Sequence, residues 1–277
     1  MNERLARDVD YTVSSMPIPV ALTVAGSDPS GGAGLQADLK TFHQFGVYGT
    51  TAVTLITVQN TVRVDRVECL DPQLVREQIR AVVEDLHPRA AKTGALGNRA
   101  IVEAVAEEAG AFDFPLVVDQ VMISKHGRPL ILPEAAEVLR LRLLPLAFLL
   151  TPNVPEAAAL SGIEIGTLAD MRRAAERLLE MGARAVLIKG GHLPGDAVDL
   201  LVARTASREY TAARTRTSHT HGTGCTYSAA ITAELALGTP LEIAVARAKA
   251  FITEAIRTSP GLGHGCGPVN HHTWRIT

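Results

Sequence analysis

The sequence of 277 residues predicts an α/β fold, in which helices cover both faces of a mostly parallel β-sheet. Three observations lead to this prediction. Short apolar, β-branched runs alternate with longer segments of helical periodicity. Glycine or proline marks most boundaries between them. Polar motifs follow several apolar runs, where a parallel sheet places them at one edge. With no internal repeat or linker in the sequence, we expect one domain over residues 18–277 and a flexible extension over residues 1–17.

The first half of the sequence alternates predicted strands and helices. Residues 18–26 are apolar and β-branched, which favours a buried strand. Residues 32–46 have a helical period and are closed by glycine, and residues 71–86 begin with an N-cap aspartate followed by proline. We also expect strands at 49–60 and 115–121, a short strand and turn at 89–96, and helices at 99–110 and 132–144.

The second half continues the alternation and then changes character. Residues 146–153 and 183–191 are apolar and strand-like, and residues 167–182 form an amphipathic helix that ends in glycine. Residues 197–203 and 207–215 are predicted to form an antiparallel pair. Helices are expected from residue 224 to about residue 258.

Composition excludes several classes of function. Aromatic residues make up 4% of the chain and the formal net charge is −2, so we expect no nucleic-acid partner. No apolar stretch approaches the roughly 18 residues of a membrane span, and residues 1–17 lack the apolar region of a signal peptide. Cys69, Cys225 and Cys266 form no CxxC pair. These features together predict a cytoplasmic protein with no membrane association.

The motif "HGTGCT" (residues 221–226) leads into a run of small and apolar residues typical of a helix. The amides of Gly222, Thr223, Gly224 and Cys225 could converge at the helix start, where N–H groups and the helix dipole attract phosphate. At such a position the pKa of the Cys225 thiol is expected to be lowered, which favours a base or nucleophile. The alternative is a glycine-rich turn with a buried, inert cysteine.

Charged and amide side chains follow three other predicted strands. Asn153 and Glu156 lie three residues apart at a helix start, where they could hold hydrated Mg²⁺ beside nucleotide phosphates or simply cap the helix. Asp119 ends an apolar strand and could be a second Mg²⁺ contact. Lys189 ends another strand and could contact phosphate. Asp119 and Lys189 could equally be charged residues that leave the sheet into solvent.

Asp38 and Gln59 indicate a pocket for a small heterocycle. Asp38 lies on the helix that follows a glycine-rich loop, and Gln59 lies at a strand end. A carboxylate and an amide facing one pocket would suit a ring that donates and accepts hydrogen bonds. A helix-surface aspartate and a turn-capping glutamine are the alternative. The C-terminal Cys266, His271 and His272 have a spacing that fits no standard metal site, so we expect an ordered glycine-rich tail there.

The order of the motifs is more specific than any one of them. The series "AGSDPSGGAGLQADLKTF", "TVQNT", "KTGAL", "TPNVPEAAAL", "KGGH", "HGTGCT" and "GHGCGPV" resembles the hydroxymethylpyrimidine/phosphomethylpyrimidine kinases, which are ribokinase-like enzymes of thiamine synthesis. The resemblance runs from about residue 20 to residue 271. It implies a three-layer α/β/α sandwich, use of ATP and Mg²⁺, and pairing into a homodimer. The implied reaction phosphorylates 4-amino-5-hydroxymethyl-2-methylpyrimidine and then its monophosphate.

The resemblance also implies roles for individual residues. Gln59 should bind the pyrimidine, with Asp38 beside it and Ala33, Thr57 and Val121 lining the pocket. Asp119, Asn153 and Glu156 should lie near Mg²⁺ and phosphates, and Lys189 near the ATP phosphates. Residues 222–225 should form the anion hole, with Cys225 where most ribokinase-like sugar kinases have a catalytic aspartate.

Two departures from the family pattern bear on specificity. Ala95 replaces the bulkier methionine usual after "KTG", which widens the expected pocket, and His219 replaces a common asparagine. A wider pocket favours the rival prediction of a pyridoxal or pyridoxine kinase on the same fold. A sensor that binds pyrimidine or nucleotide without turnover is a further alternative, but it predicts degraded phosphate and metal positions, whereas Asp119, Glu156 and Lys189 are present.

Overall fold

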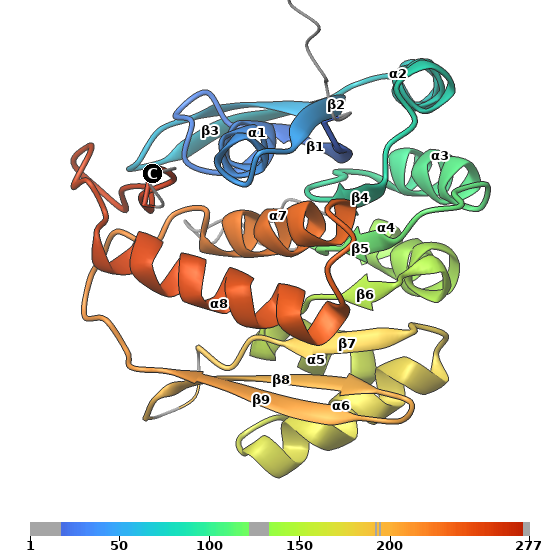
Figure 1. Ribbon diagram of the computed structural model, residues 1–277. Coiled ribbons are helices and arrows are strands. Elements are labelled where there is room, and N and C mark those ends of the chain that lie inside the picture. Colours follow the sequence, from blue (N-terminus) through green and yellow to red (C-terminus); the bar gives the residue numbers. More distant parts are fainter. Residues whose placement is uncertain (1–17, 122–132, 192, 194, 274–277) are drawn as a thin grey trace, which may run out of the picture.

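The computed structural model describes residues 18–121, 133–191, 193 and 195–273, so the extension expected over residues 1–17 lies outside it. The described chain is a three-layer α/β/α sandwich around one nine-stranded sheet, which confirms the predicted fold class (Figure 1). The strand order is β3-β2-β1-β4-β5-β6-β7-β8-β9. Neighbouring strands in the run β2-β1-β4-β5-β6-β7 pair in parallel. The edge strand β3 pairs antiparallel with β2, and at the other edge β8 pairs antiparallel with both β7 and β9.

The central strands are short and buried on both sides because helices cover both faces of the sheet. The edge strand β3 was not predicted; its sequence, "VDRVEC", is half exposed and carries an Arg66–Glu68 ion pair. The strands are β1 (Val20–Ser27), β2 (Tyr48–Gln59), β3 (Val64–Cys69), β4 (Ala90–Thr93), β5 (Leu116–Val118), β6 (Leu149–Leu150), β7 (Ala185–Ile188), β8 (Ala197–Ala203) and β9 (Ser207–Ala212).

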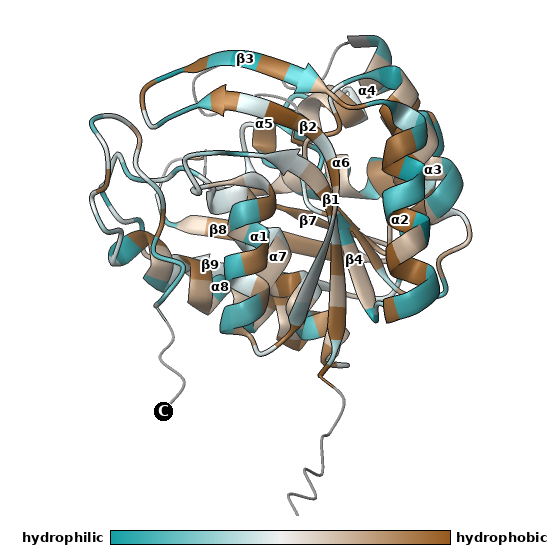
Figure 2. Ribbon diagram, turned by 90° about the horizontal axis from the view of Figure 1, so that it is seen from above, coloured by the Kyte–Doolittle hydropathy of each residue, from teal (hydrophilic) through white to brown (hydrophobic). Residues whose placement is uncertain are grey.

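The helices form two layers. One layer holds α1 (Gly34–Gln44), α7 (Thr223–Ala236) and α8 (Leu241–Arg257), and α7 lies almost fully buried against the middle of the sheet (Figure 1). In Figure 2 the central strands are mainly white to brown, whereas the edge strand β3 and the outer helices, such as α2 and α3, also carry teal, hydrophilic residues. The other layer holds α2 (Pro72–Leu86), α3 (Arg99–Ala109), α4 (Pro133–Val138), α5 (Val154–Ser161) and α6 (Leu168–Glu180).

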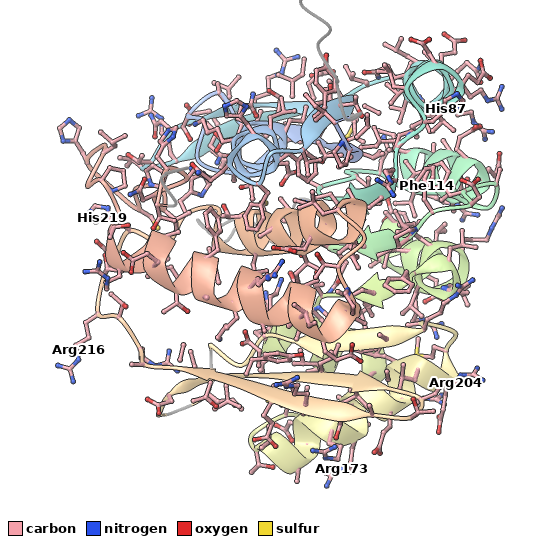
Figure 3. All side chains as sticks on the ribbon, in the orientation of Figure 1. His87, Phe114, Arg173, Arg204, Arg216 and His219 are labelled. Atoms are coloured by element: carbon pink, nitrogen blue, oxygen red, sulfur yellow. The ribbon has the colours of Figure 1, made fainter. Side chains whose placement is uncertain are left out.

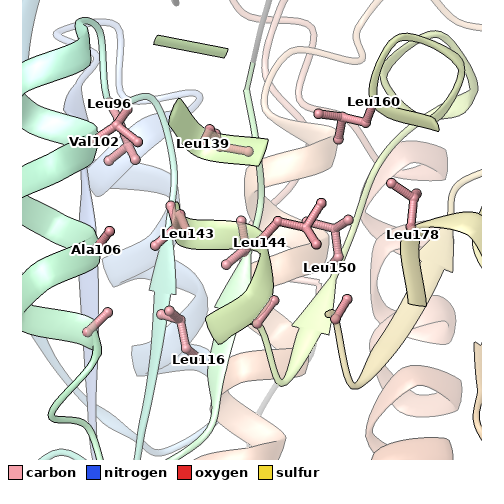
Figure 4. Packing of buried hydrophobic residues seen from close by; sticks show 14 of the residues in the cluster. Leu96, Val102, Ala106, Leu116, Leu139, Leu143, Leu144, Leu150, Leu160 and Leu178 are labelled. Carbon is pink, nitrogen blue, oxygen red and sulfur yellow. The ribbon is translucent and has the colours of Figure 1, made fainter. Parts of the chain in front are cut away.

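The segment predicted as one helix over residues 132–144 is interrupted. Within the described part, α4 passes into a π-helical turn, η1 (Leu139–Leu143), and then a 3₁₀ turn, η2 (Leu144–Leu146). The wider turn shifts the register, so that Leu139, Leu143 and Leu144 all reach the core. These three leucines belong to one core cluster with apolar residues of the neighbouring helices and strands (Figure 4). The cluster includes Val102 and Ala106 of α3, Leu116 and Leu150 of the sheet, Leu160 of α5 and Leu178 of α6.

The C-terminal tail docks on the segment that precedes α7. The His221 amide donates to the Gly267 carbonyl (3.1 Å), and the Val269 amide donates to the His221 carbonyl (3.3 Å). The buried His271 ring places Nε2 3.1 Å from the Thr226 hydroxyl. The tail is therefore ordered up to the last described residues. Among the described residues, no three His, Cys, Asp or Glu side chains are placed to hold a metal ion, and no described helix is long and apolar enough to cross a membrane.

The burial of His271 predicts a pH-dependent stability. Burial lowers the pKa of His271 from 6.5 to about 4, with help from the charge of Lys40. Between pH 6.5 and about 4, His271 is protonated in the unfolded chain but stays neutral in the folded chain. The free energy of unfolding therefore falls as the pH drops through this range. Between pH 7 and 5, wild type should lose about 2 kcal/mol more unfolding free energy than His271→Gln, measured by urea denaturation. Equal losses in both proteins would contradict the assignment.

Candidate functional site

The site lies where the starts of α1 and α7 meet at the carboxyl edge of the sheet. Gly222, the N-cap of α7, has φ 78° and rests on the carbonyl oxygen of Gly32, which a Cβ would overlap. Only glycine satisfies both the positive φ and the close approach. The glycine loop before α1 and the turn before α7 are therefore held in direct contact.

The start of α7 has backbone N–H groups that no side chain caps in the described chain. The N–H groups of Gly224 and Cys225 therefore emerge from its first turn. A Cβ added to Gly224 would lie 3.5 Å from Lys189 Nζ and 4.0 Å from Asp119 Oδ2. The helix dipole, the amides and an ammonium group thus share one location.

Asp119 and Lys189 form a pair beneath that turn. Lys189 Nζ lies 3.2 Å from Asp119 Oδ1, and Ser228 Oγ donates to Asp119 Oδ2 at 2.8 Å. Burial raises the pKa of Asp119, but the charges of Lys189 and Lys92 outweigh burial, so the pKa is lowered overall. The side chain of Asp119 is 3% exposed, so this residue does not leave the sheet into solvent.

Asn153 and Glu156 lie at the start of α5 as a capping box. The Asn153 side chain accepts from the Glu156 amide, and Glu156 Oε2 accepts from the Asn153 amide, both at 2.9 Å. Gln120 Nε2 approaches Glu156 Oε2 at 3.4 Å, while the buried Gln120 Oε1 has no hydrogen-bond partner among the described residues. Burial lowers the pKa of Lys189, but the charges of Asp119 and then Glu156 outweigh burial, so the pKa is raised overall. Capping accounts for the spacing, and the oxygens of Asp119, Gln120 and Glu156 also suit Mg²⁺.

Asp38 is buried below the site rather than exposed on the surface of α1. Its Oδ1 accepts from Lys92 Nζ and its Oδ2 from Thr23 Oγ1, both at 2.7 Å, and the Asp38 and Lys92 side chains are fully buried. Lys92 is not among the residues predicted for the site. Its signal was a lysine inside the apolar strand "AAKT", because a fully buried lysine needs a charged partner.

The expected lowering of the Cys225 pKa is wrong. Burial raises the pKa of the thiol to about 12, and the opposing charge of Lys92 and the Gly34 N–H offset only part of this effect. The helix start is enclosed by the loop before α1, so loss of water outweighs the helix dipole. The Cys225 thiol is protonated at neutral pH.

Gln59, Ala33, Thr57 and Val121 surround the same loops. Gln59 ends β2, and its amide contacts His221, which in turn contacts Asp28 at 2.8 Å. The Ala33 amide donates to Asp28 (2.9 Å), Thr57 donates to the Ser27 carbonyl (3.0 Å), and the Val121 amide donates to the Asp119 carbonyl (3.0 Å). The buried pair of His221 and Asp28 was not predicted from the sequence.

The two positions that depart from the family pattern lie in different places. The Ala95 carbonyl accepts from the Thr54 hydroxyl (2.6 Å), and its small side chain is half buried. His219 Nδ1 accepts from the Gly267 amide at 3.2 Å. His219 and Arg216 lie at the edge that carries the loop before α7, whereas His87, Phe114 and Arg204 lie at the opposite edge (Figure 3).

Comparisons with known proteins agree on one family. A family model described as phosphomethylpyrimidine kinase matches residues 28–270. A hydroxymethylpyrimidine/phosphomethylpyrimidine kinase of Bacillus subtilis is 45% identical over 263 residues, covering 94% of this chain and 97% of the relative. A thiamine biosynthesis bifunctional protein of Geobacter sulfurreducens is 48% identical over 252 residues, covering 90% of this chain and 51% of the relative. The ADP complex of Bacillus subtilis pyridoxal kinase superposes with a TM-score of 0.87 at 40% identity, covering 94% and 100% of the two chains, and shows that the fold is ribokinase-like.

The buried Asp38–Lys92 pair predicts a large effect of removing one partner. Lys92→Met leaves the Asp38 carboxylate buried without its cation and should lower the unfolding free energy by about 3–5 kcal/mol. The double variant Lys92→Met/Asp38→Asn removes the stranded charge and should recover much of that loss. Urea denaturation of the three proteins measures both effects. A loss below about 1 kcal/mol in Lys92→Met would contradict the pairing.

Proposed function

This chain belongs to the phosphomethylpyrimidine kinase family, and on that premise we propose that it uses ATP to phosphorylate 4-amino-5-hydroxymethyl-2-methylpyrimidine and then the resulting monophosphate. The diphosphate would serve thiamine biosynthesis, the process for which the Geobacter relative is named. The observation that carries the proposal is the uncapped start of α7 beside the Lys189 ammonium. A phosphoryl group in transfer requires N–H donors and a cation at one place.

The anion hole acts mainly by electrostatic stabilisation. The N–H groups of Gly222, Gly224 and Cys225 and the Lys189 ammonium would stabilise the charge that develops on the transferred phosphoryl group. The Thr223 N–H donates to the Thr220 carbonyl (3.3 Å), so Thr223 would contribute only if that bond were exchanged for one to phosphate. These groups are held by buried contacts before substrate arrives, so little reorganisation is needed during reaction. Lys189 would also hold the ATP phosphates.

Mg²⁺ is proposed to accompany ATP at Asp119 and Glu156, with Asn153 close to the phosphates. This ion prefers hard oxygen ligands, such as the carboxylate oxygens of Asp119 and Glu156. Gln120 Oε1, which has no hydrogen-bond partner among the described residues, is a further oxygen of this kind. When bound, Mg²⁺ would neutralise charge on the phosphates. Ser228 and Lys189 orient the Asp119 carboxylate for this purpose.

Cys225 has a narrower role than a preformed base. With its pKa raised to about 12, the thiol is almost entirely protonated at neutral pH. We propose that the S–H group positions the hydroxymethyl oxygen, and that the hydroxyl proton passes to an oxygen of the transferred phosphoryl group, because a protonated thiol cannot accept it. The second step uses a phosphate acceptor that is already ionised, so it needs no base.

The heterocycle is proposed to bind between Gln59, Ala33, Thr57 and Val121, with Asp38 below. The half-buried positions of Gln59, Ala33 and Val121 near the α7 start support this pocket. Pyridoxal is a second candidate substrate, favoured by the small Ala95 and by the likeness to Bacillus subtilis pyridoxal kinase.

A substrate comparison tests the proposed function. Incubation with Mg·ATP and either hydroxymethylpyrimidine or pyridoxal should give pyrimidine mono- and diphosphate and little pyridoxal phosphate, resolved by mass. Lys189→Met should lower kcat at least about 100-fold. Pyridoxal phosphate as the main product would favour the vitamin B6 kinase. Binding of either compound without turnover would support a sensor and contradict the kinase.

We also propose a cytoplasmic homodimer. The three cysteines are free, as expected in a reducing compartment. At the β2–β3 edge the apolar side chains of Tyr48, Ile56 and Val58 are 57%, 49% and 53% exposed. An apolar strand face of this kind, next to an edge strand, is suited to cover by a second copy.

A charge on the exposed face of β2 should break the proposed dimer. Ile56→Lys should give monomers at concentrations where wild type is dimeric, measured by light scattering, because a lysine cannot be buried unpaired. Leu141→Lys is the matched control, since Leu141 is 56% exposed on η1, far along the chain from β2. Monomeric wild type, or a dimer of Ile56→Lys, would contradict the assigned face.

A further inference from the structure

His221 joins three segments of the site and is fixed on every side. Its ring is buried, with Nε2 2.8 Å from Asp28 Oδ2 and 3.1 Å from the Gln59 amide nitrogen. The ring packs on Gly32, where a Cβ would overlap Cδ2. Its backbone is hydrogen-bonded on both sides to the C-terminal tail. His221 thus cannot move independently of the glycine loop or of the α7 start.

Asp28 can only accept hydrogen bonds at neutral pH. It already accepts from the Ser30 amide (2.9 Å), the Ser30 hydroxyl (2.7 Å), the Gly32 amide (3.2 Å) and the Ala33 amide (2.9 Å). Burial raises its pKa, but the hydrogen bonds from His221 and Ser30 lower it overall. An ionised carboxylate has no proton to donate, so the hydrogen of the Asp28–His221 bond lies on His221 Nε2, whether the ring is neutral or charged.

The same nitrogen cannot also accept a hydrogen bond from Gln59. With Gln59 Nε2 at 3.1 Å, two N–H donors would face one another. The oxygen and nitrogen of a glutamine amide have nearly the same shape, and the hydrogen-bond network decides which is which. A half-turn of the amide puts Oε1 opposite His221, where it shares the single Nε2–H with Asp28 Oδ2 in a bifurcated hydrogen bond, and turns the NH₂ group to the other side.

We propose that His221, held by Asp28, is a positioning residue that fixes the Gln59 amide with its oxygen toward His221 and its NH₂ group as donor to the substrate ring. This inference rests on the proposed function, in which Gln59 contacts the heterocycle. A 4-aminopyrimidine offers a ring-nitrogen acceptor beside an amino donor, which matches an NH₂ donor beside the remaining lone pair of Oε1. A 4-oxopyrimidine in its N3–H form presents the reverse order. With the amide unable to rotate, the site should select the amino form.

Two histidine variants test the inference. The probes are 4-amino-5-hydroxymethyl-2-methylpyrimidine and its 4-oxo analogue, and the readout is the ratio of their kcat/KM values. His221→Phe removes the donor and frees the amide, so the ratio should fall about tenfold or more, mainly through KM for the pyrimidine and not for ATP. His221→Gln can again present an N–H at the Nε2 position and should restore most of the ratio.

A matched variant separates failure of this inference from failure of the proposed pocket. Gln59→Leu should abolish the preference, because no amide remains to be oriented. If Gln59→Leu leaves both KM and the ratio unchanged, the pocket itself is wrong. If Gln59→Leu abolishes the preference but folded His221→Phe keeps it, only the role of His221 is overturned. Should His221→Phe fail to fold, His221→Leu and the ¹⁵N shift of the His221 ring, expected to report a protonated Nε2 at pH 7, decide the question.

Discussion

The close contact between Gly222 and the carbonyl oxygen of Gly32 is the constraint on which the site depends. It brings together the starts of two helices that lie far apart in the sequence and leaves no space for a side chain between them. Gly224 then lies against Lys189 and Asp119, and Cys225 is enclosed above the Asp38–Lys92 pair. The ribokinase-like fold of this family supplies the sheet edge, and the glycines allow the loops to close over it.

Balanced buried charges set the chemistry below this contact. Two aspartates, Asp38 and Asp119, oppose two lysines, Lys92 and Lys189. Each carboxylate also accepts a hydroxyl hydrogen bond, from Thr23 and Ser228 respectively, so the oxygens not facing a lysine are partnered. Burial strengthens the electrostatic interactions between these charges, and the same burial excludes water from Cys225. A protonated thiol therefore accompanies the proposed anion site, as expected if catalysis depends on positioning more than on a base.

The sequence predicted the layers, most elements and the set of motifs, because buried parallel strands and capped helices have strong local patterns. Asp71 and the Asn153–Glu156 pair cap their helices as their spacing indicates. The partners of Lys92 and His221 could not be predicted, since Asp38 and Asp28 are distant in sequence and only folding brings them together. The Cys225 pKa was mispredicted because a helix start was taken as open, whereas desolvation depends on tertiary packing.

The most direct test of the account is a structure of the protein with Mg²⁺, the pyrimidine and a non-hydrolysable ATP analogue. We expect the terminal phosphate at the start of α7, hydrogen-bonded by the amides of Gly224 and Cys225 and by Lys189, with the hydroxymethyl oxygen beside the Cys225 thiol. A terminal phosphate held elsewhere, with these amides turned away from it, would contradict the central claim that this turn is the phosphoryl-transfer site.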